Sequence, residues 1–415
     1  MYEDLALLAV FIFIYSAIAG AVERTWISGP IVFTGFGLII GPLGFDLLSW
    51  ETDRETIRSL AEMTLALVLF TDAAEADMRV LKKAWKLPVR LLLIGLPLTI
   101  LLGFGVGVLL VDELSFFTIA LLAVMLAPTD AALGKAVISN EAVPSETRQS
   151  LNVESGLNDG ICVPVLFVFL ALALDKADNA GPWELVIKLV LEEIGIGLAV
   201  GLALTFIAVL LLRTALQRKW LTATWTQLPV VALAVACFAT AQHFGGSGFI
   251  ATFTGGLLFG VLEKDVRNEF LRAAEGTGDT LALITWVIFG AAVIGQAVGN
   301  FSWSVLLYAV LSLTIIRMLP VFLALTGSGI STNGKLFMGW FGPRGLASIV
   351  FAVIVLNSEL PHSDLIAMTV VCTVALSIIA HGITANPLVA AYTARIKGPA
   401  KKIAGKAVMK KRSDK

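Results

Sequence analysis

Charge is scarce in this chain. Of its 415 residues only 15% are Asp, Glu, Lys or Arg, whereas 57% are hydrophobic, and the mean hydropathy is +0.88. A soluble domain is about a quarter charged, so this composition excludes an ordinary soluble globular protein. The net charge of −1 says little, because the distribution of charge carries the information. The chain is predicted to be a polytopic membrane protein.

Cysteine and phosphate-binding motifs are also scarce. The three cysteines, Cys162, Cys237 and Cys372, are single and lie inside apolar runs, so their spacing suggests neither a disulfide framework nor a metal site. The sequence has no GxxxxGK[ST] loop, which leaves ATP-driven pumping by this chain unsupported. No Cys/His cluster suggests a redox or zinc centre, and no cofactor is expected. If the chain moves a solute, an ion gradient must supply the energy, and the protein is a transporter rather than an enzyme.

Apolar runs of membrane-spanning length are abundant. Runs of roughly 18 to 25 residues are long enough to cross the hydrocarbon core as helices. Thirteen such spans are predicted, although the third, fifth and ninth are weak or interrupted, so that twelve or fourteen remain open. Their predicted bounds are 5–23, 28–47, 56–73, 88–111, 115–138, 149–174, 184–212, 226–243, 246–262, 279–299, 303–325, 335–356 and 364–386.

Basic residues divide unequally between the two sides of these spans. With the N-terminus outside, the inside loops and the C-terminal tail hold 24 of the 30 Lys and Arg residues, and only Arg54 and Lys176 fall in outside loops. Because cytoplasmic loops carry the excess of basic residues, the N-terminus is predicted outside and the C-terminus in the cytoplasm. Residues 1–394 are expected to form one transmembrane domain, followed by a short basic tail at 395–415.

Two predicted spans are interrupted by proline beside polar groups. The fifth contains Pro128, Thr129 and Asp130, and the twelfth contains Pro343 and Arg344. Proline removes a backbone donor and clashes with the preceding turn, so each helix is expected to break there. Proline is also common in unbroken membrane helices, but two corresponding sites with charges favour a functional interpretation. The offset of seven spans predicts two inverted six-helix repeats, whose broken fifth and twelfth helices cross at the midplane.

The sixth predicted span supplies a candidate ion site. Ser155 and Asp159 are four residues apart, so they share one face of a helix. Their oxygens, the Thr129 hydroxyl and carbonyls freed by the first break are hard ligands that suit an alkali cation. We therefore predict that Na⁺ binds at Asp159, Ser155 and Thr129. The further candidates for ion or proton binding are Asn158, Asp130 and Asp72.

One carboxylate that binds either a proton or a cation is enough for coupled exchange. Burial favours the protonated form of a carboxyl and a bound cation favours the charged form, so the two ligands compete. If the empty, charged site crosses the membrane poorly, every crossing carries one ligand or the other. This is the logic of an antiporter. The alternative for Asp159 is a structural, hydrogen-bonding side chain.

The other buried charges need partners, because an unpaired charge is costly at membrane depth. We expect Glu154 to pair with Arg317 as a structural ion bridge, on charge balance and on the family resemblance given below. Arg344 is expected near the second break, where it neutralises helix C-terminal carbonyls or a carboxylate such as Asp130. Asp130 would in turn compensate the N-terminus of a half-helix. Three roles stay open for Asp72: a cation ligand, a carboxylate at the mouth of an access funnel, or an interfacial residue at a helix end. The residues expected to serve packing or to lie at the rim are Glu62, Glu192, Glu193 and His381.

Three stretches together, APTDAALGKAVI, LNVESGLNDG and FGPRGLAS, resemble the monovalent cation–proton antiporters. The resemblance is to the sodium/proton exchanger branch with an Asn-Asp pair in the sixth helix, and it covers essentially the whole membrane domain. It implies that Asp159 is the shared cation and proton site. It also implies that Asn158 replaces a second Asp found in the electrogenic branch, so that exchange is electroneutral. The other implied assignments are the ligands Ser155 and Thr129, the bridge Glu154–Arg317 and the second essential arginine, Arg344.

By the same resemblance, the protein would be a homodimer in a lipid bilayer. Each protomer would have a core bundle around helices 5, 6, 12 and 13 and a dimerisation domain, and the core would move by an elevator or rocking motion. The expected function is exchange of Na⁺ or Li⁺ for H⁺, in the plasma membrane of a prokaryote. A K⁺/H⁺ antiporter stays open, and a cation channel or a cation-coupled solute symporter is less favoured. No nucleic-acid partner is expected.

Overall fold

The computed structural model is all helical in the part of the chain that it describes. The described residues are 2–22, 25, 27–47, 54–75, 85–130, 133–138, 140–174, 190–222, 224–263, 267–294, 302–358 and 360–413. Within them the helices fall into thirteen segments in the predicted order; the fifth and the twelfth are interrupted at the predicted prolines, and the eleventh is also divided, at Thr314. The prediction of an all-helical membrane protein with two broken spans is therefore confirmed.

The helices are formed by apolar runs without β-strand alternation, and in chain order they have the following bounds. They are α1 (Tyr2–Val22), α2 (Gly29–Ile40), α3 (Arg54–Glu75), α5 (Lys86–Arg90) with the π-helical turn η1 (Leu91–Gly95) and α6 (Leu96–Leu110), α7 (Phe116–Met125), α8 (Lys135–Ile138), α9 (Ser145–Ala173), the π-helical turn η2 (Val190–Ile194) with α11 (Gly195–Gln217), α12 (Pro229–His243), α13 (Gly248–Leu262), α14 (Arg267–Ile288) with the π-helical turn η3 (Phe289–Ile294), α16 (Trp303–Leu313), α17 (Ile315–Ala324), α18 (Thr332–Trp340), α19 (Leu346–Leu356) and α20 (Ser363–Ser413).

The outer surface of this helical body is apolar. Among the described residues, six helical stretches are long and apolar enough to cross a membrane, and five shorter apolar helices accompany them. Large hydrophobic side chains such as Phe13, Leu109 and Trp303 are more than three-quarters exposed. Exposed apolar side chains on this scale suit a lipid environment and would be unfavourable in water.

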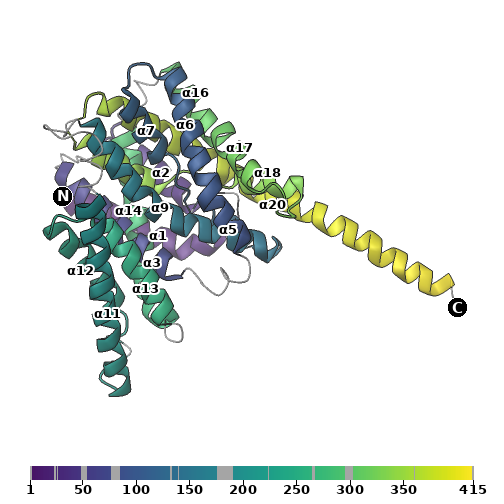
Figure 1. The fold of residues 1–415 in the computed structure, drawn as a ribbon, viewed down its shortest axis with the longest axis horizontal. Helices are drawn as coiled ribbons and strands as arrows, with labels where there is room; N and C mark the ends of the chain where they lie inside the picture. Colours follow the sequence, from purple (N-terminus) through teal and green to yellow (C-terminus); the bar gives the residue numbers. More distant parts are fainter. Residues whose placement is uncertain are drawn as a thin grey trace.

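The helices gather into one bundle, from which the C-terminal part of α20 projects (Figure 1). One group is built on α13, which packs against α3, α11 and α12. A Cβ at Gly256 or Gly260 of α13 would meet the backbone of α3 at Phe70 or Ala74, so these glycines permit the close approach of the two helices. A second group contains α7 with α9 and α19 with α20. Contacts of α3 with α9 and α19 join the two groups at the broken segments.

The last helix continues well beyond its predicted end at residue 386. α20 passes through Pro387, where proline loses one backbone hydrogen bond but keeps a φ angle that a helix accepts. The next turns are held by packing, because Val389 and Tyr392 join a buried cluster with α18. The Tyr392 ring stacks on Phe337 with 4.2 Å between ring centroids. Tertiary contacts therefore extend this helix beyond the end that the apolar run predicted.

Two other predicted bounds differ from the structure. The predicted span 303–325 is two helices, because the backbone at Thr314 (φ −111°, ψ −95°) leaves the helical region between α16 and α17. The predicted span 28–47 ends early, since α2 stops at Ile40 and a turn follows at Gly41. Parts of the predicted seventh and tenth spans, 184–189 and 295–299, lie outside the described residues.

Candidate functional site

The first break lies between α7 and α8. Ser115 caps the start of α7, where its hydroxyl accepts a hydrogen bond from Thr118 N–H, and the helix ends at Met125. Beyond it the chain is non-helical through Pro128, which has no N–H to continue the ladder. The carbonyls freed at this end need partners. One is supplied by the Ser348 hydroxyl, which donates to Met125 O at 2.8 Å.

Arg344 satisfies two more of these carbonyls. It comes from the second break and is completely buried, and its Nη1 donates to Ala127 O at 2.7 Å and to Pro128 O at 3.0 Å. A cation at a helix C-terminus interacts favourably with the helix dipole. The sequence left two partners open for Arg344, the helix C-terminal carbonyls and a carboxylate such as Asp130. In the structure, these hydrogen bonds of its guanidinium group go to the carbonyls.

The second break, between α18 and α19, crosses the first. Asp130 N–H donates to Pro343 O at 2.8 Å, and this hydrogen bond joins the two non-helical segments. The Asp130 carboxylate accepts from Leu346 N–H at 2.7 Å, the first residue of α19, and from Leu133 N–H at 3.0 Å. Asp130 therefore lies at the N-terminus of a half-helix, where a negative charge is stabilising.

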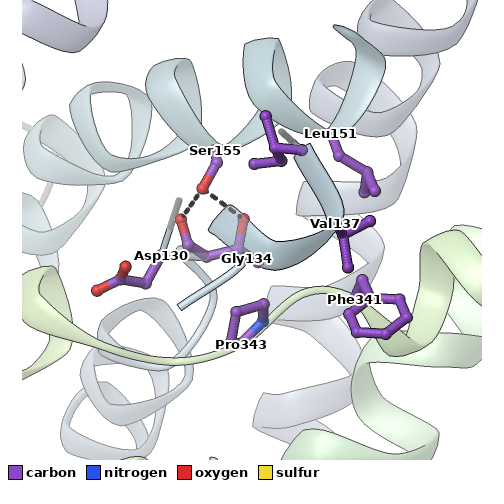
Figure 2. A pocket seen from close by; sticks show the side chains of 9 residues that line it. Asp130, Gly134, Val137, Leu151, Ser155, Phe341 and Pro343 are labelled. Carbon is purple, nitrogen blue, oxygen red and sulfur yellow. Dashed lines mark hydrogen bonds between the residues drawn. The ribbon is translucent and has the colours of Figure 1, made fainter. Parts of the chain in front are cut away.

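Hydroxyl and amide groups connect α9 to the first break. The Ser155 hydroxyl donates to the Thr129 carbonyl, and Thr129 Oγ1 lies 3.5 Å from Ser155 Oγ. Figure 2 shows Ser155 pointing from α9 towards the broken segment, with Pro343 of the second break on the other side. Asn158 Nδ2 donates to Thr129 Oγ1 at 2.7 Å. The structure thus brings Thr129, Ser155 and Asn158 together.

Asp159 is buried with an unpartnered oxygen. Asp159 is 8% exposed, and its Oδ1 has no hydrogen-bond partner among the described residues. The neighbouring Asn158 Oδ1 is likewise buried without a partner there. Buried polar atoms are almost always satisfied, so an orphaned carboxylate oxygen needs an explanation. A bound cation or proton would supply the missing partner. No cluster of three or more His, Cys, Asp or Glu side chains that could hold a resident metal occurs in the described part of the chain.

Glu154 and Arg317 form a closed ion pair next to these groups. Arg317 Nη1 donates to Glu154 Oε1 at 2.6 Å and Nη2 donates to Oε2 at 2.8 Å. Both residues are 1% exposed. A bidentate pair of this kind uses both carboxylate oxygens, so it leaves Glu154 little capacity to bind an ion. The guanidinium group lies against Gly342, where a Cβ would overlap it.

Asp72 lies against α9 at Gly156, the residue after Ser155. It is half-buried near the end of α3, and a Cβ added at Gly156 would lie 3.5 Å from its Cβ. It is within electrostatic reach of both Asp130 and Asp159. The structure therefore places Asp72 beside the site, although among the described residues it makes no hydrogen bond to Ser155 or Thr129. Of the weaker candidates, Glu62 pairs with Arg58 at 2.6 Å.

A small pocket opens beside the hydroxyl groups (Figure 2). Its polar wall is formed by the two breaks and Ser155, and its apolar wall comes from α8, α9 and the end of α18. The lining residues are Thr129, Asp130, Gly134, Val137, Ile138, Leu151, Ser155, Phe341 and Pro343. Asp159 lies one helical turn beyond Ser155 and does not line this pocket. The pocket therefore reaches the candidate site from its hydroxyl side.

The sequence analysis missed two serines that support the breaks. Ser348 binds the end of α7, and Ser377 Oγ accepts from Arg344 N–H at 2.7 Å. Both are at most 1% exposed. The only available signal was a hydroxyl inside an apolar run, which is also found in membrane helices where it bonds to its own backbone.

Two broken helices that meet at buried, oxygen-rich groups define a class of protein, the ion transporters built from inverted repeats. The family model described as "Sodium/hydrogen exchanger, transmembrane" matches residues 7–391. The chain belongs to this family of membrane transporters.

Individual relatives are distant. A Na(+)/H(+) antiporter of Saccharomyces cerevisiae is 26% identical over 377 residues, which are 86% of this chain and 38% of that protein. The K(+)/H(+) antiporter NhaP of Alkalimonas amylolytica is 22% identical over 389 residues, which are 93% of this chain and 66% of that protein. The chain spans about half the length of the curated relatives it matches.

The fold is also similar to a solved structure. The sodium proton antiporter MjNhaP1 of Methanocaldococcus jannaschii superposes with a TM-score of 0.73 and 22% identity, covering 91% of this chain and 98% of that one. At this level of identity the likeness establishes the fold, and the ions that this chain carries must be argued from its own site.

Proposed function

We propose that this chain is a secondary antiporter that exchanges Na⁺ or Li⁺ for H⁺, with both ions competing for Asp159. The observation that carries the proposal is the buried Asp159 Oδ1, which has no partner in the described residues. Of the neighbouring carboxylates, Glu154 is occupied by Arg317, Asp130 accepts from backbone N–H groups, and Asp72 is only half-buried. Asp159 is therefore the carboxylate that is free to exchange ligands.

The ligand set supports an alkali cation. Asp159 supplies a charged oxygen, and Ser155 and Thr129 supply hydroxyls on the same side of α9 as the first break. Every group is an oxygen, which suits a hard cation and disfavours soft metals. A proton on Asp159 removes the charge that attracts the cation, and a bound cation disfavours the proton. Each state is neutral at this carboxyl, so either can cross a low-dielectric barrier more easily than the empty site.

A K⁺/H⁺ antiporter is the second candidate. It is favoured by the relatives from Alkalimonas amylolytica and Shewanella, which are named K(+)/H(+) antiporters. The same carboxylate and hydroxyls would serve, with a wider coordination shell.

We also propose how the site moves and where it lies. The core bundle would contain α7, α8, α9, α18, α19 and α20, and it would shift by an elevator or rocking motion against a dimerisation domain that includes α1 and α2. The N-terminus would be outside and the tail after residue 394 in the cytoplasm of a prokaryote. Light scattering of the purified protein tests the homodimer, and a mass of one protomer plus detergent would contradict it.

The function is tested in proteoliposomes that hold a pH gradient. Addition of Na⁺, Li⁺ or K⁺ outside should collapse the gradient if the cation is a substrate. Collapse by Na⁺ or Li⁺ supports the sodium antiporter, and collapse by K⁺ alone supports the second candidate. No response to any of the three between pH 5 and pH 9 would contradict both.

A further inference from the structure

His381 holds one end of the second break. His381 belongs to α20 and is 1% exposed. Its Nε2 lies 2.8 Å from the carbonyl of Trp340, the last residue of α18. The Trp340 ring lies over the imidazole with 5.2 Å between centroids. His381 therefore meets the chain where the helix stops and the non-helical segment begins.

Ser377, one turn earlier on α20, holds the other end. Its hydroxyl accepts from Arg344 N–H at 2.7 Å and lies 3.2 Å from His381 Nδ1. The two side chains thus bind both ends of the segment 341–345 from a single turn of helix. The guanidinium group of the same Arg344 reaches Ala127 O and Pro128 O in the first break.

One neutral tautomer of His381 can link the Trp340 carbonyl to the Ser377 hydroxyl. If Nε2 carries the proton, it donates to Trp340 O, and Nδ1, which lies 3.0 Å from the Ser377 carbonyl and 3.2 Å from the Ser377 hydroxyl, accepts from the hydroxyl. The Ser377 oxygen remains free to accept from Arg344 N–H. The neutral imidazole therefore completes a continuous chain of hydrogen bonds from the end of α18 to Arg344. These donor and acceptor roles are assigned from the partners.

We propose that His381 is a positioning residue for the ion site. Through Ser377 it fixes the backbone of Arg344, and through the Arg344 guanidinium it fixes the carbonyls that precede Thr129. Loss of this support would loosen Thr129 and weaken cation binding at Asp159, without removing any ligand. The inference rests on the proposed antiport function, and it concerns the affinity of the site rather than the identity of the ion.

Four variants test the proposal. His381→Ala and Ser377→Ala each remove a hydrogen bond to one end of the break. His381→Gln keeps an N–H that can donate to Trp340 O. Thr384→Val is the matched control, because Thr384 accepts from the Trp340 indole at 2.9 Å and so joins the same two helices through side chains, without a hydrogen bond to the backbone of the break. KM and Vmax for Na⁺ and the thermal shift that Na⁺ produces are measured for each, together with the pH profile.

His381→Ala and Ser377→Ala should raise KM about five- to tenfold, the effect of losing a buried hydrogen bond, while Vmax changes little. The same variants should need proportionally more Na⁺ for half the thermal shift. His381→Gln should restore most of the affinity, and Thr384→Val should keep the KM of the unmodified protein. If His381→Ala does not fold, Ser377→Ala and His381→Gln still decide the question.

Three results would overturn the positioning role. KM could stay unchanged in folded His381→Ala and Ser377→Ala while the unmodified protein exchanges normally. KM could rise as much in Thr384→Val, which would reduce the contact to general helix packing. The pH profile could move in His381→Gln, which would make His381 a titrating group. If the unmodified protein shows neither exchange nor a Na⁺-dependent thermal shift, the proposed function itself fails.

Discussion

At the scale of single residues, the buried charges separate by their partners. The Glu154 carboxylate is held by two guanidinium nitrogens, and Asp130 accepts from the backbone of Leu346 and Leu133. Asp159 has an oxygen with no partner in the described residues. A carboxylate that is already satisfied gains little from a cation. We therefore propose that the exchange chemistry belongs to Asp159.

Asp159→Asn should abolish cation-dependent proton movement, because an amide has no charge to neutralise and no carboxyl proton to release. Cys162→Ala is a matched control, since Cys162 is also fully buried and lies three residues along α9. Transport in proteoliposomes and the thermal midpoint of both variants are measured. Retained exchange in well-folded Asp159→Asn would remove Asp159 from the site.

At the scale of whole helices, the two breaks are held in position by contacts from α9, α17 and α20. The Glu154–Arg317 pair joins α9 to α17, and the Arg317 side chain lies against Gly342 in the second break. The pair therefore sets the position of the break as well as neutralising two charges. Its function is predicted to be structural.

Glu154→Gln should lower the free energy of unfolding by about 3–5 kcal/mol, because it leaves the Arg317 charge buried without a counter-charge. KM for Na⁺ should change much less than in a variant of the ligand set. The double variant Glu154→Leu with Arg317→Met should recover much of the stability, since an apolar pair removes both charges together. A raised KM with an unchanged thermal midpoint in Glu154→Gln would instead make Glu154 a ligand.

Gly342→Ala should destabilise the protein by about 1–3 kcal/mol, the usual cost of overpacking a filled interior. The added Cβ would overlap the Arg317 guanidinium group, which cannot withdraw without losing Glu154. Gly276→Ala on α14 is the control, because a Cβ there meets nothing within 4 Å. The thermal midpoint of unfolding is measured for both variants. Equal midpoints for Gly342→Ala and Gly276→Ala would contradict this account of Gly342.

Local sequence patterns predicted the helices and their breaks better than the contacts between helices. Pro128 and Pro343 located both breaks, because proline acts on its own helix. The contact of Glu154 with Arg317 was predicted from the cost of burying either charge alone together with the family resemblance, which chose Arg317 over Arg344. The support from Ser377 and His381 was not predictable, since a helix that fulfils its own backbone bonds gives no sign of which neighbour its side chains meet. The end of α20 was missed for a related reason, because the packing of Tyr392 on Phe337 acts over 55 residues of sequence.

At the scale of the whole molecule, the charges around the breaks balance. Glu154 cancels Arg317, and each break contributes one charge of opposite sign, Asp130 and Arg344. In the proposed mechanism, Asp159 is neutralised by its proton or its cation. A moving core would therefore carry the same net charge in both loaded states, and exchange should be electroneutral.

A membrane potential should therefore leave the rate and the end point of exchange unchanged. A net charge that crosses the membrane would gain about 2.3 kcal/mol per 100 mV, which is large enough to shift the end point visibly. The potential is imposed on proteoliposomes at a fixed pH and Na⁺ gradient, and the final pH is compared with that in vesicles without a potential. A voltage-driven shift would contradict one-for-one exchange.

The central claim is that a cation and a proton compete for one carboxylate, and the dependence of KM on pH tests it most directly. Under competition, protonated Asp159 cannot bind Na⁺, so KM should rise by up to about tenfold for each pH unit below the point where the carboxyl is half protonated. Vmax at saturating Na⁺ should stay nearly constant, because excess cation displaces the proton. A KM that does not change with pH, together with a falling Vmax, would contradict the account and would place proton binding at a separate group.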